Sequence, residues 1–366
     1  MKHTGELIGK YDEKASLEDA FTIPAPWYTS PEMLKLETQA VFERTWQAIG
    51  QTGQLASPGD YITAQVGKEP VLAVRGADGS LNGFFNVCRH HAAAVAVEPC
   101  GRAQSFRCPY HGWTYGLDGK LKGAPEFNEV RNFDRAQNGL VPLRVDTWEQ
   151  FVFATLDAGT PPLEEFVGGL AKVVRPLNLR GLRFYTRKVY TLDCNWKVFV
   201  DNYLDGGYHV PHLHKGLNSA LEYKQYTIEN GERYSVQSSP MVRSDEDGAV
   251  AATRQGDRAY YLWLYPNFMI NVYQGVMDTN LVSPMGVDKT QVIFDFFFDE
   301  VNPEHEARNA ESVAVSETIQ DEDVGICESV QRGLRSRAYG AGRLSVRRES
   351  GEHLFHRLLA QQLKSF

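Results

Sequence analysis

Two short motifs, each pairing one cysteine with one histidine, constrain this chain more than any other feature of its sequence. They are Cys88-x-His90 and, seventeen residues later, Cys108-x-x-His111. Two loops of this kind can hold one metal centre, either a tetrahedral zinc ion or a [2Fe-2S] cluster with the cysteines on one iron and the histidines on the other. Zinc sites usually separate the two residue types into C-x-x-C and H-x3-5-H pairs. Because each pair here is mixed, the spacing favours the iron–sulfur cluster.

The residues around these motifs resemble the signature of a Rieske [2Fe-2S] cluster. Pro109 stiffens the second loop, Gly112-Trp113 follows it, and Gly116-x-Asp118-Gly119 continues into a tight turn. The C-x-H spacing selects His90 as the ligand of the first loop. We expect the adjacent His91 to be a neighbouring donor.

The bulk composition limits the classes of protein to which the chain can belong. Its 366 residues suffice for two or three domains, and 42% hydrophobic with 23% charged residues are typical of a soluble globular protein. The net charge of -8 disfavours nucleic acid or an anionic membrane as a partner. No apolar run approaches the roughly 20 residues of a membrane span, and no signal or transit pattern opens the chain. We therefore expect a cytoplasmic protein whose remaining cysteines are plain thiols.

Three segments follow from the pattern of apolar residues and turn signals. Residues 1–45 contain a helix that begins at Pro31, and this segment is expected to pack on the C-terminal domain. Residues 46–157 alternate short strands with Gly, Pro, Asn and Asp turns, which predicts a compact all-β domain with the metal loops at its tip. Residues 158–366 mix helices with long strands. The strands are expected at 184–192, 233–242, 259–273, 278–284 and 290–298, and the helices near 163–174, from Trp196, at 304–333 and at 351–364.

A second candidate metal site lies in the sequence DNYLDGGYHVPHLH at 201–214. His209 and His214 are five residues apart, or about 140° on a regular helix, so an undistorted helix would not direct both at one ion. Pro211 lies between them and should break that regularity. Two imidazoles and a carboxylate from elsewhere form the facial triad of non-haem Fe(II) oxygenases. His212 is a competing ligand, because His209-x-x-His212 also lies on one helical face.

Over nearly its full length the chain resembles the α subunit of Rieske non-haem iron oxygenases, and within them the choline monooxygenase-like group. The motifs that carry the resemblance are DNYLDGGYHVPHLHKGL, YPNFMIN at 265–271, MDTNL at 277–281 and CESVQRGL at 327–334. The resemblance implies an α+β protein with an all-β Rieske domain and a helix-grip catalytic domain, an antiparallel sheet with helices. It also implies one [2Fe-2S] cluster and one mononuclear Fe(II) per subunit.

The resemblance also implies the ligands and the electron path. Its pattern assigns the iron to His209, His214 and Asp323, with Asp321 as the alternative carboxylate. A helix that simply begins with acidic residues would explain the charges at 321–323 but not the rest of the motif. In such proteins electrons cross from the cluster of a neighbouring subunit in a homotrimer. A carboxylate three residues before the first histidine usually bridges the two centres.

This sequence departs from that pattern at the bridging position. Gly206 occupies it, and the acid is Asp205, one residue earlier, with Asp201 as a further candidate. Asn202 matches a family position near the iron. Either Asp205 bridges the two centres from one residue earlier, or electrons follow another route.

The resemblance implies O2-dependent hydroxylation of a small quaternary ammonium compound, by choline- or betaine-like monooxygenation or N-demethylation. Electrons would come from a separate NAD(P)H-dependent flavin or ferredoxin-type reductase, because no Gly-rich loop opens a βαβ unit here. An ammonium cation needs aromatic faces. Candidates are Tyr203, Tyr208, Trp263, Tyr265, Phe268, Tyr273 and Phe294. Residues 271–279, NVYQGVMDT, lack an Arg and a Trp that choline enzymes carry, which weakens choline in particular as the substrate.

Three alternatives stay open at this point. An aromatic-ring-hydroxylating dioxygenase α subunit would usually keep an acid at position 206 and have a β partner subunit. A Rieske electron-transfer protein would not need the second metal site. A zinc-stabilised scaffold protein would be colourless, whereas a Rieske cluster is red-brown.

Overall fold

The computed structural model describes residues 2–242 and 253–366. The chain divides into two compact units, Thr38–Phe166 and Met1–Glu37 with Val167–Phe366. The N-terminal segment up to Glu37 thus belongs to the larger unit. Among the described residues, no helix combines the length and apolar character needed to cross a membrane.

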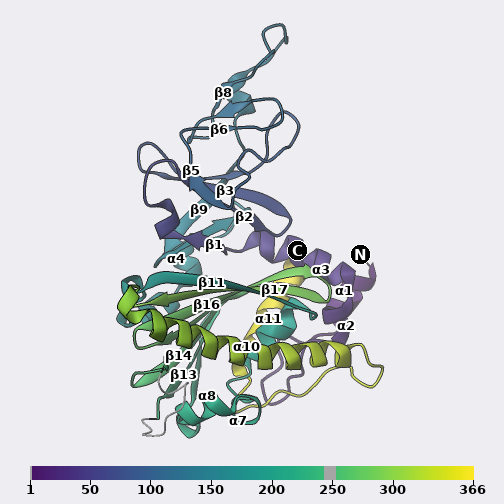
Figure 1. Cartoon of the computed structure of the whole chain (residues 1–366). Helices are drawn as coiled ribbons and strands as arrows, with labels where there is room; N and C mark the ends of the chain where they lie inside the picture. The colour runs from purple at the N-terminus through teal and green to yellow at the C-terminus, as the bar shows by residue number, and fades with distance from the viewer. Residues whose placement is uncertain (1, 243–252) are drawn as a thin grey trace. The chain divides into compact units, whose positions relative to one another are not determined.

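The smaller unit is built from antiparallel strands (Figure 1). Seven of them form a sheet in the order β1-β10-β9-β4-β3-β2-β5, and three form a second sheet in the order β6-β7-β8. The strands are β1 (Gln47–Gln51), β2 (Asp60–Val66), β3 (Glu69–Arg75), β4 (Leu81–Phe85), β5 (Cys100–Arg102), β6 (Phe106–Arg107), β7 (Thr114–Tyr115), β8 (Leu121–Gly123), β9 (Pro142–Trp148) and β10 (Phe151–Thr155). The all-β prediction for this domain is confirmed.

A tight core in the smaller unit anchors both cysteine loops. Cys88 and Cys108, each 3% exposed, lie in one buried cluster with Phe84, Trp113 and Tyr115. The turn between β7 and β8 closes this cluster on one side. Gly119 has φ +74 there, and a Cβ on it would lie 2.3 Å from Phe84. Only glycine fits at that position, as the predicted Asp-Gly turn requires.

The larger unit contains a seven-stranded antiparallel sheet in the order β11-β17-β16-β15-β14-β13-β12. Its strands are β11 (Arg183–Leu192), β12 (Thr227–Asn230), β13 (Tyr234–Pro240), β14 (Arg258–Leu264), β15 (Phe268–Tyr273), β16 (Val276–Gly286) and β17 (Lys289–Phe298). The single strand expected at 259–273 is wrong, because β14 and β15 form a hairpin through Tyr265–Asn267. Pro266 lies in that turn, where it has no ladder hydrogen bond to donate.

Helices cover this sheet (Figure 1). The α-helices of the described residues are α1 (Lys2–Gly9), α2 (Ala25–Thr29), α3 (Pro31–Ala40), α4 (Leu163–Val167), α5 (Leu170–Val174), α6 (Trp196–Leu204), α7 (Val210–Leu213), α8 (Lys215–Ala220), α10 (Glu306–Leu334) and α11 (Ser350–Ser365). Helix α6 contacts β16, β17, α10 and α11. The helix expected near 163–174 is divided into α4 and α5 around Gly168, which has φ +56.

A buried ion pair ties the N-terminal segment to α6. Glu37 of α3 accepts hydrogen bonds from Lys197 Nζ at 2.7 Å and Trp196 Nε1 at 2.8 Å, and both charged side chains are 0% exposed. Burial raises the pKa of Glu37 and lowers that of Lys197, while the attraction between them opposes both shifts. Two neighbouring residues of α6 therefore depend on one carboxylate of the N-terminal segment, which fixes the helix that leads into the second candidate metal site.

Candidate metal centres and the adjoining cavity

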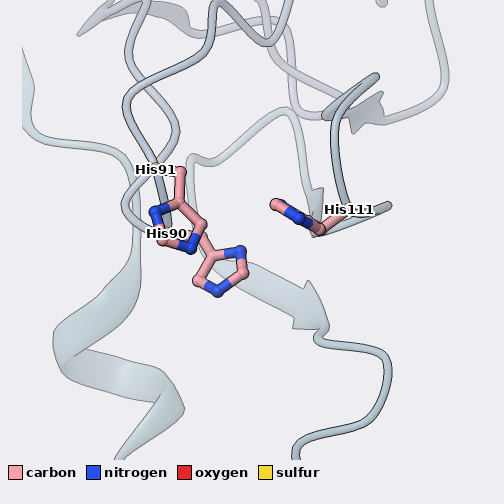
Figure 2. A group of neighbouring side chains, drawn as sticks. All are labelled: His90, His91 and His111. Carbon is pink, nitrogen blue, oxygen red and sulfur yellow. The ribbon is translucent and has the colours of Figure 1, made fainter.

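Three imidazoles face one another on the loops of the smaller unit (Figure 2). One ring nitrogen each of His90, His91 and His111 lies within 4.8 Å of the others. The His90 ring stacks on Trp113 at a centroid distance of 4.8 Å and an interplanar angle of 3°. Its buried Nδ1 has no hydrogen-bond partner among the described residues. A buried ring nitrogen without a partner fits a metal ligand.

The two thiols complete a donor set that fits a [2Fe-2S] cluster. The N–H of Cys108 donates to Trp113 O at 2.8 Å and that of Cys88 to Ala93 O at 2.8 Å, so both loops are closed turns. The Tyr115 hydroxyl lies 3.3 Å from Cys88 Sγ. The cysteines are buried, whereas His111 is exposed. Because His91 joins the same group of imidazoles, the choice of His90 rests on its spacing and on its buried Nδ1.

The second candidate site forms at the two ends of the short helix α7. His209 immediately precedes α7, and His214 immediately follows it. Asp323, in α10, directs Oδ1 at both imidazoles: the distance is 3.1 Å to His214 Nε2 and 3.9 Å to His209 Nε2. One atom of each residue lies within 4.8 Å of the others. His212 and Asp321 are exposed and lie outside this group.

Each imidazole of this triad is held by a carboxylate on its other nitrogen. His209 Nδ1 lies 2.6 Å from Asp205 Oδ2, and His214 Nδ1 lies 2.6 Å from Glu322 Oε2. Carboxylates that bind the distal nitrogen of a ligand histidine fix its tautomer and ring orientation. Burial lowers the pKa of His214, but hydrogen bonds and negative charge from Asp323 and Glu322 outweigh burial and raise it. The donor types and their second partners fit a mononuclear metal ion.

The other acids and amides of the motif have separate partners. Asn202 Nδ2 donates to Asp323 Oδ1 at 2.8 Å and so orients the carboxylate of the triad. Asp201 accepts a hydrogen bond from Tyr28 at 2.5 Å and lies 3.0 Å from His356 Nε2. Of the two candidate bridging acids, Asp205 is the one that contacts a histidine of the triad.

The backbone explains why the acid does not lie at position 206. Gly206 has φ +69, and a Cβ on it would lie 2.1 Å from the backbone oxygen of Arg348. The following Gly207 has φ +67. An acidic side chain cannot occupy this position without displacing backbone. With two left-handed glycines in between, Asp205 still reaches His209 from one residue earlier.

Replacing Gly206 by alanine should therefore reduce stability by at least about 1–3 kcal/mol, the usual cost of a non-glycine residue in this conformation, with the clash added. Chemical unfolding of the purified variant would measure the loss. The matched control is Gly79→Ala, because Gly79 also has a positive φ (+82) but no atom within 4 Å of its Cβ position. Equal losses in the two variants would mean that the backbone near Arg348 yields without cost.

A cavity adjoins the triad. His209, His214 and Asp323 line it, together with the polar side chains Asn202, Arg254, Asn271, Asp278, Asn280 and Gln320. Aromatic side chains make up much of the remaining wall. They are Phe199, Tyr203, Tyr226, Tyr261, Tyr273 and Phe294. A small molecule bound here would contact both aromatic faces and the His209–His214–Asp323 triad.

Only some of the aromatic residues suggested by the sequence line this cavity. Tyr203, Tyr273 and Phe294 do so, whereas Tyr208, Trp263, Tyr265 and Phe268 lie elsewhere. Tyr208 is 49% exposed. Phe268 lies on β15, where Asn271 and Tyr273 line the cavity, so strand alternation turns Phe268 to the opposite face. Trp263 and Tyr265 are buried and pack edge-on against each other, and Trp263 also packs against Phe355 of α11.

Sequence reasoning missed Arg254, Tyr226 and Tyr261. Strand pairing could have found Tyr261, because it lies directly opposite Asn271 in the β14–β15 hairpin. No local pattern marks Tyr226, which lies just outside β12, or Arg254. Both enter the cavity from connecting segments, whose path the tertiary structure determines.

Two family models match the chain. Residues 45–134 match the Rieske [2Fe-2S] domain. Residues 179–365 match the catalytic domain of ring hydroxylating alpha subunits.

Relatives match over nearly the whole chain. The chloroplastic choline monooxygenase of Arabidopsis thaliana is 42% identical, with 98% of this chain and 87% of that protein covered. The carnitine monooxygenase oxygenase subunit of Escherichia coli strain K12 is 32% identical, with 96% of each covered. A quaternary ammonium Rieske monooxygenase, solved to study carnitine oxidation and inter-subunit electron transfer, superposes with a TM-score of 0.87 at 30% identity, covering 96% of this chain and 99% of that one.

Proposed function

Because this chain belongs to the Rieske non-haem iron oxygenases, we propose that it monooxygenates a quaternary ammonium compound. One oxygen atom of O2 would enter a C–H bond beside the nitrogen, and the other would leave as water with two electrons and two protons. The observation that carries the proposal is the aromatic-lined cavity beside the His209–His214–Asp323 triad. Relatives named for choline and carnitine oxidation support the same substrate class.

The proposed cofactors are one [2Fe-2S] cluster and one Fe(II) ion per subunit. Cys88, His90, Cys108 and His111 would hold the cluster, and the triad would hold the mononuclear iron. When bound, the iron supplies a site at which O2 can be reduced by electrons from the cluster. The buried Nδ1 of His90 and the convergence of the triad support these ligand sets.

The chain's own side chains orient the substrate and the triad. Asn202 holds Asp323 Oδ1, while Asp205 and Glu322 hold the Nδ1 atoms of the two histidines. Tyrosine rings that line the cavity offer faces to an ammonium cation, an attraction that increases when water is excluded.

We further propose a homotrimer supplied by a separate NAD(P)H-dependent reductase. The related quaternary ammonium monooxygenase was solved to study inter-subunit electron transfer, which supports an assembly of several copies. In that arrangement Asp205 would connect the histidine of one subunit's iron site to the cluster of its neighbour.

A single-turnover experiment tests the function without the native reductase. Iron-replete protein is reduced chemically without air and mixed with O2 and one compound: choline, glycine betaine, L-carnitine or benzoate. Hydroxylation of an N-methyl group would release formaldehyde and a tertiary amine, which can be detected directly. We expect at least one of the ammonium compounds to be oxidised. A product from benzoate alone would favour an aromatic-ring dioxygenase. A Rieske spectrum without any product would favour an electron-transfer protein.

A further inference from the structure

Arg254 places a buried positive charge in the wall of the cavity. The side chain is 3% exposed and lines the same cavity as the triad. Nη1 donates to Ser312 Oγ, and Nη2 donates to Ser316 Oγ and, at 3.3 Å, to Ser312 O. All these acceptors are neutral. Among the described residues, no carboxylate lies within ion-pair distance of the guanidinium, and its buried Nε has no hydrogen-bond partner.

The helix that carries the triad carboxylate also fixes this cation. Ser312 and Ser316 belong to α10, and Asp323 follows Ser316 by seven residues on the same helix. Seven residues are nearly two turns, so Ser316 and Asp323 lie on one face about 10 Å apart along the axis. The cavity lies along that face, since Ser316, Ile319, Gln320 and Asp323 all line it. Helix α10 therefore fixes the guanidinium of Arg254 and the carboxylate of Asp323 relative to each other.

Tyrosine rings line the same cavity. Tyr226 and Tyr261 are nearly parallel with centroids 6.3 Å apart, and Tyr261 and Tyr273 meet edge-on at 6.1 Å. The Arg254 guanidinium lies over the Tyr273 ring, 4.8 Å from its centroid. The hydroxyl of Tyr203 donates to Asn271 Oδ1 at 2.8 Å, which fixes that ring as well.

The nearby carboxyl does not neutralise the guanidinium by contact. Asp278 is buried and accepts a hydrogen bond from Asn271 Nδ2 at 2.7 Å. Burial raises the pKa of Asp278, and the positive charge of Arg254 opposes that rise. Burying a charge without a paired group is costly, so an anion bound in the cavity would stabilise the Arg254 side chain.

We infer that the substrate is a zwitterion, a quaternary ammonium compound that also carries a carboxylate. The carboxylate would bind the guanidinium of Arg254, and the ammonium group would lie against the tyrosine rings nearer the triad. An alcohol such as choline presents a hydroxyl in place of the carboxylate and would leave Arg254 without an anion. This inference rests on the proposed function and adds the substrate class within it.

Glycine betaine and choline make a matched pair of probes, because they share the trimethylammonium group and differ in a carboxylate and an alcohol. Their binding to the full-length holoprotein can be measured without air by calorimetry. We expect glycine betaine to bind at least about tenfold more tightly than choline, as for a hydrogen-bonded charge pair. Arg254→Gln should weaken glycine betaine about 10- to 100-fold and leave choline nearly unchanged. Arg254→Lys should lie between, because it keeps the charge but loses the planar fork.

Arg258→Gln is the matched control. Arg258 donates to Ser238 Oγ at 2.8 Å and does not line the cavity, so both affinities should stay at the wild-type values. If Arg254→Gln does not fold, the preference of the wild type for glycine betaine over choline and the affinities of Arg254→Lys test the proposal. Equal or tighter binding of choline by the wild type, or an unchanged preference in the Arg254 variants, would overturn the zwitterion and leave ammonium oxidation standing. Failure of every ammonium compound to bind would overturn both.

Discussion

Replacing Asp323 by alanine should abolish substrate oxidation while leaving the visible spectrum of the [2Fe-2S] cluster intact. Asp323 Oδ1 lies 3.1 Å from His214 Nε2 and 3.9 Å from His209 Nε2, so it is the only carboxylate that closes the triad among the described residues. Losing a group that merely supports a metal ligand costs 10- to 100-fold, so loss of a ligand should exceed about 100-fold in turnover. Single-turnover product, bound iron and the visible spectrum would be measured on the same sample.

Asp321→Ala is the matched control for this substitution. Asp321 lies two residues earlier on the same helix, carries the same charge and is exposed outside the triad. Its removal should leave turnover and iron content at the wild-type values. Loss of activity in the Asp321 variant alone would identify Asp321 as the ligand. Loss of the cluster spectrum in the Asp323 variant would show that the substitution damages more than the triad.

The sequence predicted best the residues whose chemistry depends on local spacing. The His209-x4-His214 interval with Pro211 indicated a broken helix, and the structure places a short helix between the two histidines. The two Cys/His pairs likewise indicated a Rieske domain, which the match over residues 45–134 confirms. Asp323 comes from a distant helix, and only the family resemblance pointed to it. A short motif can place two candidate ligands near each other, but the position of the third depends on how α10 packs.

The wall of the cavity could not be predicted in the same way. Each position depends on which face of a strand points inward and on which helix packs over that part of the face. Tyr261 and Trp263 lie two residues apart on the same face of β14, yet Tyr261 lines the cavity whereas Trp263 packs against Phe355 of α11. Arg254 carries no motif at all. Its role depends on Ser312 and Ser316, which lie about sixty residues away on α10.

Changing Asp205 to asparagine should slow electron delivery to the iron without releasing the metal. Asp205 Oδ2 lies 2.6 Å from His209 Nδ1 and accepts the backbone N–H of His209 at 3.0 Å. Asparagine keeps the shape and one acceptor but loses the negative charge that polarises the imidazole. Loss of such a supporting carboxylate typically costs 10- to 100-fold. We expect reoxidation of the reduced cluster by O2, followed in a rapid-mixing experiment with substrate bound, to slow by about this factor, with iron content unchanged.

The matched variant for this prediction is Asp201→Asn, which removes the other acid of the same motif. Asp201 contacts Tyr28 and His356 and no histidine of the triad, so its substitution can weaken packing but should leave the reoxidation rate unchanged. The two substituted positions are four residues apart and lose the same charge. Comparing them therefore separates a specific electron path through Asp205 from a general electrostatic effect. Slow reoxidation in the Asp201 variant alone would move the bridge to Asp201. Wild-type rates in both would mean that electrons reach the iron without either carboxylate. The acid would then stand at position 205 only because the backbone requires glycine at position 206.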